Sequence, residues 1–479
     1  MKRIAIIGGG IAGITAAYEL AKFARNGAPV EATLFESTSR LGGIIETVRE
    51  GGFVIECGPD GWVTEKPWAR QLAEELGLAS ELIPSNDATR RTYVLRDSVL
   101  RPIPDNMSMM VPSNLDALDA LTASPLFTQT AIDSYRSEPS RAAELKATAP
   151  VTDESIASFV LRHFGPEVLH TIAAPLLSGV LGGDVESLSA RAVLAPYVAM
   201  EREHGSLIAA LQAKRSANHA SRTSLFTTLR SGLATLIDRL IANIPQHWLR
   251  LNTTIDAIHP TATGWTLQPS PSSHSRNNHS LTFDAVILST PVDVTRDLLL
   301  PIDQRAALLL PTDSSSAVIV AFALPDASRF PVPPGFGFLV PPDANPAGNN
   351  HEQSMLLACT FTDQKFDHRV PPNGRLIRAF FGGRAADRLM RCNNDEIASV
   401  ARHELARTLG PMPDPQISIV RRLPRSLPQY SVGHLDRMAE LTTRITQHPN
   451  LHLLGNAYNG VGLPDLIRDA RTTTQKAIS

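Results

Sequence analysis

The sequence predicts a mixed α/β (α+β) protein with more than one domain. Three observations indicate this fold class. An apolar strand over Arg3–Ile7 runs directly into a glycine-rich turn, and a helix-forming run and a second strand follow. From Leu115 to about Leu211 the chain is rich in alanine and leucine at helical spacing, which predicts a separate helical domain. From Ala317 to Arg384 several apolar runs predict a second sheet.

The turn after the first strand carries Gly8, Gly10 and Gly13 in the pattern G-x-G-x-x-G. Between a strand and a helix, the first glycine permits the tight turn and the second lets the backbone approach a pyrophosphate. The third lets the helix and the strand pack closely. The helix expected over Thr15–Phe23 then offers free N–H groups to the phosphate. This unit predicts a Rossmann-type domain that binds an adenine dinucleotide, either NAD or FAD.

A second strand is expected over Val30–Glu36, and its last residue is acidic. An acid roughly 20 residues beyond the glycines accepts hydrogen bonds from ribose hydroxyls. Just past it, Arg40 precedes the pair Gly42-Gly43. A second glycine pair beside an arginine suits a further phosphate contact near a flavin, which favours FAD. An ordinary loop with a surface arginine is the alternative interpretation.

Composition excludes several classes of function. A chain of 479 residues is too long for one core. The formal net charge of −2 gives no basic field for nucleic acid and no polybasic lipid anchor. No stretch reaches the roughly 20 apolar residues of a transmembrane helix, and the first apolar run does not have the pattern of a signal peptide. Three scattered cysteines without metal-site spacing favour a reducing compartment, so we expect a cytoplasmic protein.

The elements of the first part follow in chain order. Gly51-Gly52 predicts a hairpin within Arg49–Cys57, and a turn-rich loop over Gly58–Gly61 comes next. A helix is expected over Trp68–Leu78 and a further hairpin over Tyr93–Val99. The apolar faces of the alanine-rich helices favour a packed core over a membrane surface.

The second part of the chain returns to strands. Those expected are Leu249–Ile258, Gly264–Gln268, Thr282–Ser289, Ala317–Phe322, Met355–Thr362, Leu376–Gly382 and Asn450–Leu454. The polar, low-complexity segment Pro269–Ser280 predicts a hairpin tip, and Asn394–Leu409 predicts a helix.

A second glycine-rich loop, Gly455–Gly462, precedes a final helix expected over Leu463–Thr474. A glycine-rich backbone before a helix start makes a nest for an anion or a carbonyl group. In a flavoprotein such a nest stabilises the negative charge on the N1–C2=O edge of the reduced flavin. The alternative interpretation is a plain turn before an amphipathic helix.

With both ends considered, the chain resembles the flavin amine oxidase-like superfamily. Within it the chain is similar to the oxygen-dependent porphyrinogen oxidases, which comprise protoporphyrinogen IX oxidases and flavin-type coproporphyrinogen III oxidases. The glycine turn and the loop after Glu36 occur across the superfamily. The stretches specific to the porphyrinogen branch are G-V-L-G-G-D (Gly179–Asp184), H-G-S-L (His204–Leu207), G-F-G-F-L-V-P (Gly335–Pro341), P-Q-Y-S-V-G-H (Pro428–His434) and G-N-A-Y-N-G-V-G-L-P-D (Gly455–Asp465).

The resemblance implies an FAD-binding domain of three separated segments, residues 1–90, 222–292 and 420–479. It implies a β-sheet substrate domain from residues 91–110 and 293–419, and an inserted helical domain from residues 111–221.

The resemblance also implies cofactor-binding residues along most of the chain. Those expected around the ADP half and the pyrophosphate are Gly8, Gly9, Gly10, Ile11, Ala12, Gly13, Glu36, Ser37, Arg40, Gly43 and Ile44. Those expected along the flavin ring are Gly58, Pro59, Asp60, Gly61, Gly455, Val461, Gly462 and Leu463. Ile255 is expected to meet adenine through its backbone, and Leu423 stands where some relatives place a tryptophan near the flavin.

On the substrate side, Phe336 and Leu339 are expected to line a tetrapyrrole pocket. Arg91, or its neighbour Arg90, is expected to offer a cation to a propionate, although a solvated edge strand would carry the same arginines. Relatives often have serine and phenylalanine where this chain has Gly61-Trp62, so Trp62 is expected to narrow the pocket.

The implied activity is the six-electron oxidation of a porphyrinogen to a porphyrin in haem biosynthesis, with FAD as cofactor, oxygen as acceptor and hydrogen peroxide as product. No catalytic acid, base or metal is assigned, because the cofactor carries the difficult step. Coproporphyrinogen III is slightly favoured over protoporphyrinogen IX, since Arg90, Arg91, Arg96 and Arg101 cluster near the propionate side.

The resemblance leaves further expectations and alternatives open. Peripheral membrane contact and handover of the product to a ferrochelatase are compatible with it. A flavin amine oxidase would place two aromatic rings before the flavin, and Tyr430 and Tyr458 are the late tyrosines available. A polyene desaturase and a non-catalytic flavin-binding scaffold are the remaining alternatives.

Overall fold

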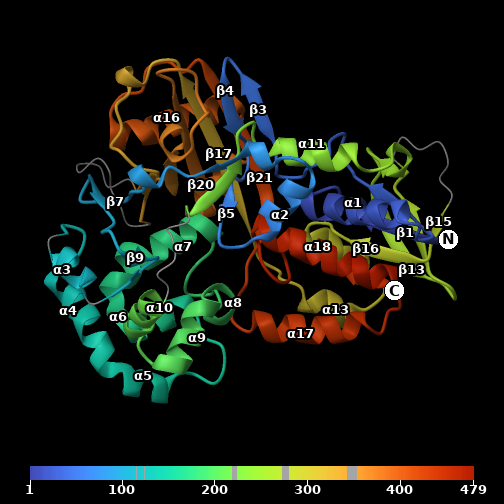
Figure 1. Cartoon of the computed structure of the whole chain (residues 1–479), viewed down its shortest axis with the longest axis horizontal. Coiled ribbons are helices and arrows are strands. Elements are labelled where there is room, and N and C mark those ends of the chain that lie inside the picture. Colours follow the sequence, from blue (N-terminus) through green and yellow to red (C-terminus); the bar gives the residue numbers. More distant parts are fainter. Residues whose placement is uncertain (115, 123, 218–223, 272–279, 342–352) are drawn as a thin grey trace.

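The computed structural model describes the chain except residues 115, 123, 218–223, 272–279 and 342–352. Figure 1 shows three regions: a layered α/β region at the N- and C-termini, a second sheet region, and a cluster of helices beside them.

The first region is built on a parallel sheet of five strands in the order β12-β2-β1-β16-β22. The strands are β1 (Lys2–Ile7), β2 (Val30–Phe35), β12 (Leu249–Arg250), β16 (Ala285–Leu288) and β22 (Leu451–Leu453). Because a parallel sheet is covered on both faces, its central strands are mostly apolar: Ile4–Ile7 of β1 and every residue of β16 are buried.

Helices cover one face of this sheet: α1 (Ile11–Arg25), α2 (Trp68–Glu75), α11 (Ala234–Ala242) and α18 (Leu463–Ile478). The other face carries a small antiparallel sheet of β13 (Ile255–Pro260), β14 (Trp265–Pro269) and β15 (Leu281–Phe283). The helices α12 (Val292–Leu299), α13 (Gln304–Leu309) and α17 (His434–Ile445) complete that layer. The elements around β1 therefore come from three parts of the chain that are far apart in the sequence.

The second region is a sheet of seven strands in the order β21-β17-β20-β19-β18-β7-β8. They are β7 (Thr92–Arg96), β8 (Val99–Pro102), β17 (Ser314–Leu324), β18 (Gly337–Leu339), β19 (Ala358–Phe361), β20 (Arg375–Gly382) and β21 (Ile417–Pro428). Among the described strands of this sheet, only β18 and β7 pair in parallel. The associated helices are α14 (Thr362–Lys365), α15 (Gly383–Leu389) and α16 (Asn394–Leu409).

The third region is helical and has its own apolar core. Its helices are α3 (Ala117–Thr122), α4 (Gln129–Ser137), α5 (Ala142–Thr148), α6 (Ile156–Val168), α7 (Ala174–Leu181), α8 (Ala190–Val193), α9 (Ala195–His204) and α10 (Leu207–Ala217). A short ribbon of β9 (Met107–Ser108) and β10 (Val111–Pro112) lies at its edge. Packed aromatic rings, among them Tyr135 and Phe164, fill this core.

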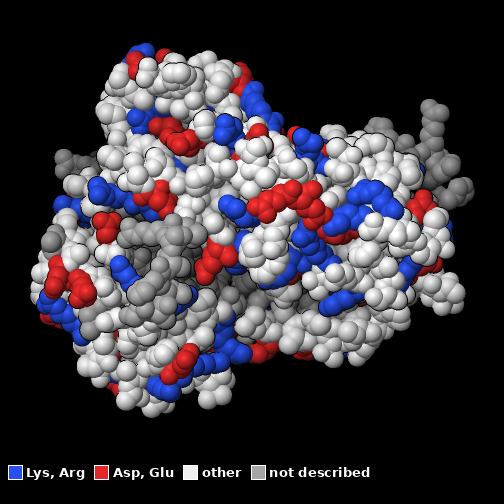
Figure 2. All heavy atoms as spheres, in the orientation of Figure 1, with Lys and Arg blue, Asp and Glu red and all other residues white. Residues whose placement is uncertain are grey.

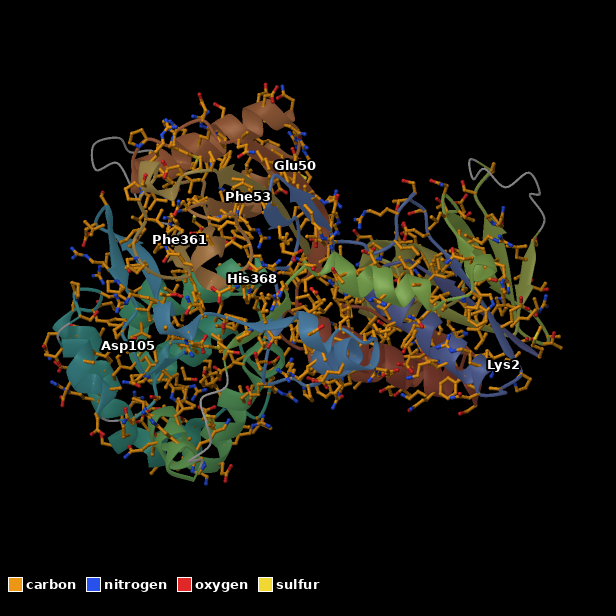
Figure 3. The ribbon with its side chains drawn as sticks, turned by 45° about the horizontal axis from the view of Figure 1, so that its top comes forward. Lys2, Glu50, Phe53, Asp105, Phe361 and His368 are labelled. Carbon is orange, nitrogen blue, oxygen red and sulfur yellow. The ribbon has the colours of Figure 1, made fainter. Side chains whose placement is uncertain are left out.

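Two smaller β units connect the regions. The hairpin β3 (Thr47–Glu50) and β4 (Phe53–Glu56) packs Phe53 and Ile55 against Ala321 and Leu376 of the seven-stranded sheet. Figure 3 shows Glu50 and Phe53 beside the part of the molecule that holds Phe361, far from Lys2 and Asp105. The strands β5 (Trp62–Val63), β6 (Leu82–Pro84) and β11 (Phe226–Leu229) form a further three-stranded sheet.

The predicted mixed fold with a Rossmann-type domain is confirmed, and two predicted strands are wrong as single strands. Thr282–Ser289 divides at Asp284: β15 pairs with β14, whereas β16 pairs with β1 in the central sheet. Leu249–Ile258 divides at Asn252, whose positive φ of 51° turns the chain between β12 and β13. Most of the predicted tip Pro269–Ser280 lies outside the described residues.

Charged groups of both signs are interspersed over the face shown in Figure 2, in keeping with the net charge of −2. In the described part of the chain, every helix is too short or too polar to cross a bilayer.

Candidate functional site

In the glycine turn between β1 and α1, two glycines are closely packed and a third has open space beside it. A Cβ on Gly8, which has a φ of +107°, would lie 2.3 Å from the Ser289 carbonyl oxygen, and one on Gly13 would lie 2.0 Å from the Gly8 carbonyl oxygen. At Gly10, by contrast, a Cβ would meet no atom within 4 Å. Two glycines thus permit close backbone packing, and the third faces open space at the start of a helix that no described side chain caps.

Glu36 lies next to this turn, immediately after β2. Its Oε2 accepts a hydrogen bond of 2.8 Å from the Gly9 N–H, and its Oε1 accepts one of 2.8 Å from the Thr38 N–H. These bonds orient the carboxylate beside the turn, where a dinucleotide ribose lies in Rossmann-type domains. The adjacent Ser37 is exposed.

The loop after Glu36 docks onto the same turn. The Gly42 N–H donates to the Gly9 carbonyl at 2.8 Å, and a Cβ on Gly43 would lie 3.2 Å from the Gly10 Cα. The Arg40 guanidinium donates to the carbonyls of Leu41, Ile45 and Gly43, so it shapes this loop through its own backbone. Its contact with a phosphate stays a prediction.

The Gly58–Gly61 segment continues the same surface. A Cβ on Gly58 would lie only 2.1 Å from the Ile44 carbonyl oxygen, so the two segments approach backbone to backbone. The Gly58 carbonyl accepts a hydrogen bond from Arg378 on β20. This segment therefore lies between the glycine turn and the seven-stranded sheet.

Asp60 in this segment is held by two cations. The Lys365 Nζ lies 3.0 Å from its Oδ1, and an Arg378 Nη lies 3.4 Å from its Oδ2. Burial by itself would raise the pKa of Asp60, but the charges of Lys365 and Arg378 outweigh it and hold that pKa below its ordinary value. Asp60 is therefore an ionised anchor that joins the first region to the second sheet.

Sequence reasoning missed both cations. Arg378 carried a signal, because it interrupts the apolar run of β20 and a charge in such a strand needs a buried partner. Lys365 carried none, since it follows a short polar stretch after β19 and pairs with a residue more than 300 positions away.

The C-terminal loop follows β22 and leaves the parallel sheet at the same edge as the glycine turn after β1. Gly455 and Gly460 have φ values of +145° and +139°, which side chains rarely adopt. The loop ends at Gly462, the N-cap of α18, and no described side chain caps that helix. Lys66 binds Asp465 in the first helical turn at 2.6 Å and ties the helix start to the segment that follows Gly61.

Ile255 and Leu423 lie on the flanks of these loops. Ile255 begins β13, just after Thr253, whose N–H donates to the Glu36 carbonyl at 2.9 Å. Leu423 lies on β21, between two residues that bind the loops of the site. Arg421 forms an ion pair with Glu46 at 3.0 Å, and the Ser426 carbonyl accepts a hydrogen bond from the Asn456 side chain at 2.9 Å. Their contacts with a cofactor stay predictions.

The residues expected on the substrate side come together at one edge of the second sheet. Phe336 donates its N–H to the Arg91 carbonyl at 2.7 Å, and Leu339 pairs with Val94 of β7. A Cβ on Gly179 of α7 would lie 3.0 Å from Leu339 Cδ2, so this edge faces the helical region. The Arg91 side chain is exposed.

The structure also shows where Trp62 and the two late tyrosines, Tyr430 and Tyr458, lie. Trp62 lies in the core under α2 and is 3% exposed, so its ring packs inside the first region. Tyr430 stacks on His434, and Tyr458 packs in the core beneath β13 and α17. Among the described rings, the two tyrosines form no facing pair of the kind that an amine oxidase would use.

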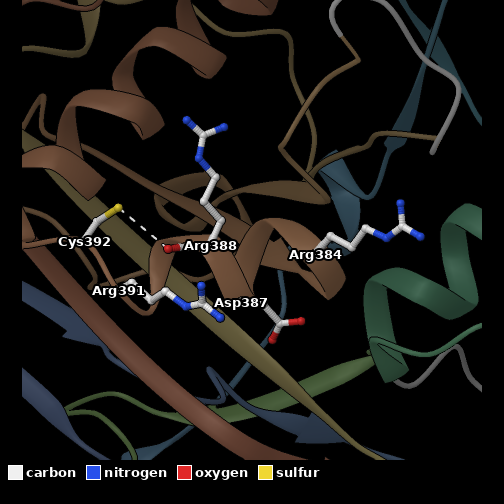
Figure 4. Close-up of a pocket in the computed structure, with 5 residues that line it drawn as sticks. All are labelled: Arg384, Asp387, Arg388, Arg391 and Cys392. Atoms are coloured by element: carbon white, nitrogen blue, oxygen red, sulfur yellow. Dashed lines mark hydrogen bonds between the residues drawn. The ribbon is translucent and has the colours of Figure 1, made fainter.

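A pocket of about 500 Å³ opens elsewhere, on α15. Figure 4 shows its lining, which is Arg384, Asp387, Arg388, Arg391 and Cys392. No residue expected to bind cofactor or substrate is among these five, so this pocket is separate from the site described above.

Comparison with known proteins gives a consistent result. Residues 11–478 match the family described as flavin-containing amine oxidoreductases. The coproporphyrinogen III oxidase of Bacillus subtilis (strain 168) is 28% identical over 487 aligned positions, which cover 100% of this chain and 98% of that protein. The coproporphyrinogen III oxidase of Staphylococcus aureus (strain NCTC 8325 / PS 47) is 26% identical, and the alignment covers 100% of this chain and 99% of that protein.

A solved structure from Exiguobacterium sp. 255-15, assigned provisionally as a protoporphyrinogen oxidase, superposes with a TM-score of 0.83. It is 29% identical, and the match covers 100% of this chain and 98% of that one.

Proposed function

The chain belongs to the family of flavin-containing amine oxidoreductases, and we propose that it is an FAD-dependent porphyrinogen oxidase whose favoured substrate is coproporphyrinogen III. The observation that carries this proposal is the edge of the second sheet where the Phe336 N–H binds the carbonyl of the exposed Arg91 and Leu339 faces α7. A tetrapyrrole has matching chemistry, because its rings are apolar and its rim carries propionates. The names of the similar proteins support the same activity.

The residues present fit an FAD. The open space at Gly10 and the uncapped start of α1 suit a pyrophosphate. Glu36 suits the ribose of the ADP half, and the uncapped start of α18 at Gly462 suits the carbonyl edge of the flavin. We therefore assign Gly8–Gly13, Glu36 with Ser37, the loop around Gly43, the segment Gly58–Gly61 and the loop end Val461–Leu463 as the residues that would hold FAD.

A bound FAD supplies a two-electron acceptor that oxygen regenerates. A porphyrinogen loses six hydrogens on its way to a porphyrin, so three rounds consume three oxygen molecules and release three of hydrogen peroxide. The protein's own part is to bind the tetrapyrrole beside Phe336 and Leu339 and to fix the segment around Asp60. We assign no protein acid or base, because pyrrole protons can leave to water.

Of the four arginines expected near the propionates, Arg90, Arg91, Arg96 and Arg101, Arg96 already has protein partners. It donates to the Leu126 carbonyl and lies 3.4 Å from Glu167 in the helical region. Arg90 and Arg91 are exposed, and neither side chain forms a hydrogen bond or an ion pair with another described residue. Arg91, next to Phe336, is our candidate for the propionate.

Replacing this candidate tests its role. Arg91→Ala should raise the KM for coproporphyrinogen III roughly 5- to 10-fold with little change in kcat, because one charge-assisted hydrogen bond is lost. Arg90→Ala is the matched control and should change the KM less than two-fold. An equal effect of both variants would remove Arg91 from the assignment.

The proposed function is tested by mixing the purified yellow holoenzyme in air with anaerobically prepared coproporphyrinogen III or protoporphyrinogen IX. Porphyrin fluorescence should rise faster with coproporphyrinogen III than with protoporphyrinogen IX, and both rates should exceed spontaneous oxidation. A faster reaction with protoporphyrinogen IX would correct the substrate. Spontaneous rates with both would overturn the activity and direct attention to amines and polyenes.

We also place the reaction in the cytoplasm, because Cys57, Cys359 and Cys392 are all free thiols, as expected in a reducing compartment. Handover of the porphyrin to a ferrochelatase and peripheral membrane contact stay predictions.

A further inference from the structure

A pair of stacked rings, Tyr430 and His434, lies behind the C-terminal glycine-rich loop. Their centroids are 3.9 Å apart with an angle of 10° between the planes. Tyr430 is 8% exposed and His434 is fully buried, so water does not compete for their hydrogen bonds. The pair belongs to a sequence motif, Pro428–His434, whose role the proposed chemistry does not explain.

The pair binds the backbone of the loop at three alternate residues. The Tyr430 hydroxyl donates to the Asn456 carbonyl at 2.7 Å and accepts from the Gly460 N–H at 3.0 Å. The His434 Nε2 lies 3.1 Å from the Tyr458 carbonyl. Since a carbonyl can only accept, Nε2 carries the proton. Burial lowers the pKa of His434 to about 4, which keeps the ring in this neutral form at neutral pH.

These bonds add to the contacts that the loop's own side chains make, in which Asn456 donates to the Ser426 carbonyl and the Tyr458 ring packs in the core. Gly455 and Gly460 have the flexible backbone of glycine and adopt positive φ angles. The loop leads directly into Val461–Leu463, the residues assigned to the flavin. Fixing Asn456, Tyr458 and Gly460 therefore fixes where the following N–H groups point.

The same motif is bound from its other side by the helical region. The Ser189 N–H donates to the Tyr430 carbonyl at 2.7 Å, and the Val432 N–H donates to the Ser187 carbonyl at 3.0 Å. Asp153 accepts from the Gly433 N–H at 2.7 Å. In Figure 1, α8 of the helical region correspondingly reaches the start of α17.

We propose that Tyr430 and His434 are positioning residues that set the flavin-facing end of the loop Gly455–Gly462 and link it to the helical region. This inference rests on the proposed function, because it takes that loop end as a flavin contact. N–H groups aimed at the carbonyl edge of a flavin stabilise the anionic reduced form more than the oxidised form. A loosened loop should therefore bind reduced FAD less well and lower the midpoint potential.

The test compares two tyrosine-to-phenylalanine variants of the holoenzyme. Tyr430→Phe keeps the stacked ring but removes both loop bonds. Tyr135→Phe is the matched control, because its buried hydroxyl also donates to a backbone carbonyl, that of Met110 at 2.8 Å, within the helical core. The readouts are the dissociation constant for FAD and the two-electron midpoint potential of the bound flavin. Neither depends on porphyrinogen turnover.

Tyr430→Phe should weaken FAD binding roughly 3- to 10-fold and lower the potential by about 30 mV, which corresponds to a ten-fold loss of preference for the reduced flavin. Tyr135→Phe should leave both quantities at the wild-type values. His434→Phe, which keeps an aromatic ring but removes the Nε2 donor, should shift the potential in the same direction by a smaller amount, and it serves if Tyr430→Phe does not fold.

Wild-type values in both Tyr430→Phe and His434→Phe would overturn this inference while leaving the proposed function intact. An equal shift in Tyr135→Phe would also overturn it, because the effect would then come from general loosening. A wild-type chain that binds no FAD would overturn the proposed function together with the inference.

Discussion

Single charged residues, paired over long sequence distances, hold the site in place. Asp60 is 14% exposed and Lys365 is 11% exposed, so their contact is only weakly screened by water. The pKa of Asp60 lies below its ordinary value of 3.8, so the pair stabilises the fold above that pH and loses its effect as the pH falls through the lowered value. Such pairs are costly to break, because the remaining charge stays buried.

Lys365→Met should therefore destabilise the protein by about 3 kcal/mol at pH 7, because it leaves Asp60 with Arg378 as its remaining cation. Urea unfolding of the wild type and the variant measures this difference. The double variant Asp60→Asn with Lys365→Met should recover part of the loss. A change below about 1 kcal/mol would show that the pair is solvated like a surface ion pair.

A second buried cluster predicts a pH dependence in the helical region. His163 is fully buried, with Nδ1 3.0 Å from Glu138 and Nε2 3.1 Å from Glu201. Burial would lower the pKa of His163, but the two carboxylates outweigh burial and raise it above 6.5. Because the folded pKa is raised, this stabilisation is complete below pH 6.5 and is lost as the pH rises through the folded value.

His163→Gln should accordingly cost about 3 kcal/mol at pH 6 and less at pH 9. Chemical unfolding at the two pH values, with wild type measured in parallel, gives the comparison. A penalty that grows with pH would contradict a charged His163.

At the scale of elements, the strand–turn–helix unit of β1 and α1 contains one glycine that folding requires and another that cofactor binding requires. Gly13 lies inside α1, where alanine normally stabilises a helix by up to about 1 kcal/mol, yet its Cβ would lie 2.0 Å from the Gly8 carbonyl oxygen. Gly10 has a negative φ of −73° and open space beside it. The two glycines therefore serve different purposes.

Gly10→Ala should leave the stability of the cofactor-free protein within about 1 kcal/mol of wild type while weakening FAD binding at least roughly 10-fold. Gly13→Ala should lower the stability of the same cofactor-free protein by more than about 2 kcal/mol. Thermal unfolding of the cofactor-free protein and FAD titration measure the two effects. Equal effects of both variants on stability would contradict the separation.

Sequence patterns predicted these elements where local chemistry decides the structure. The unit from β1 to β2, the hairpin at Gly51-Gly52 and α16, whose predicted bounds agree with the structure, all depend on local turns, caps and periodicity. The division of Thr282–Ser289 was not predictable locally, since it depends on which sheet each half joins. The long strand β21 was missed because Pro424 and Pro428 lie within an otherwise mixed run.

At the scale of the whole molecule, the candidate site is assembled from segments distant in sequence. The glycine turn and the C-terminal loop follow β1 and β22, which lie on either side of β16 in one sheet. The segment around Asp60 joins them through the close approach of Gly58 to Ile44 and through the Lys66–Asp465 ion pair. The sequence patterns and the family resemblance together predicted these segments. They did not identify Lys365 or Arg378, which join the segments to the second sheet. Long-range pairs of this kind leave no periodic pattern in the chain.

The most direct test of the proposed activity is the anaerobic reaction of the FAD-loaded protein with coproporphyrinogen III, followed through the visible absorbance of the bound flavin. The substrate should bleach the flavin, air should restore the colour, and about three oxygen molecules should be consumed per porphyrin formed. A flavin that stays oxidised under a saturating excess of coproporphyrinogen III and of protoporphyrinogen IX would contradict the proposed activity.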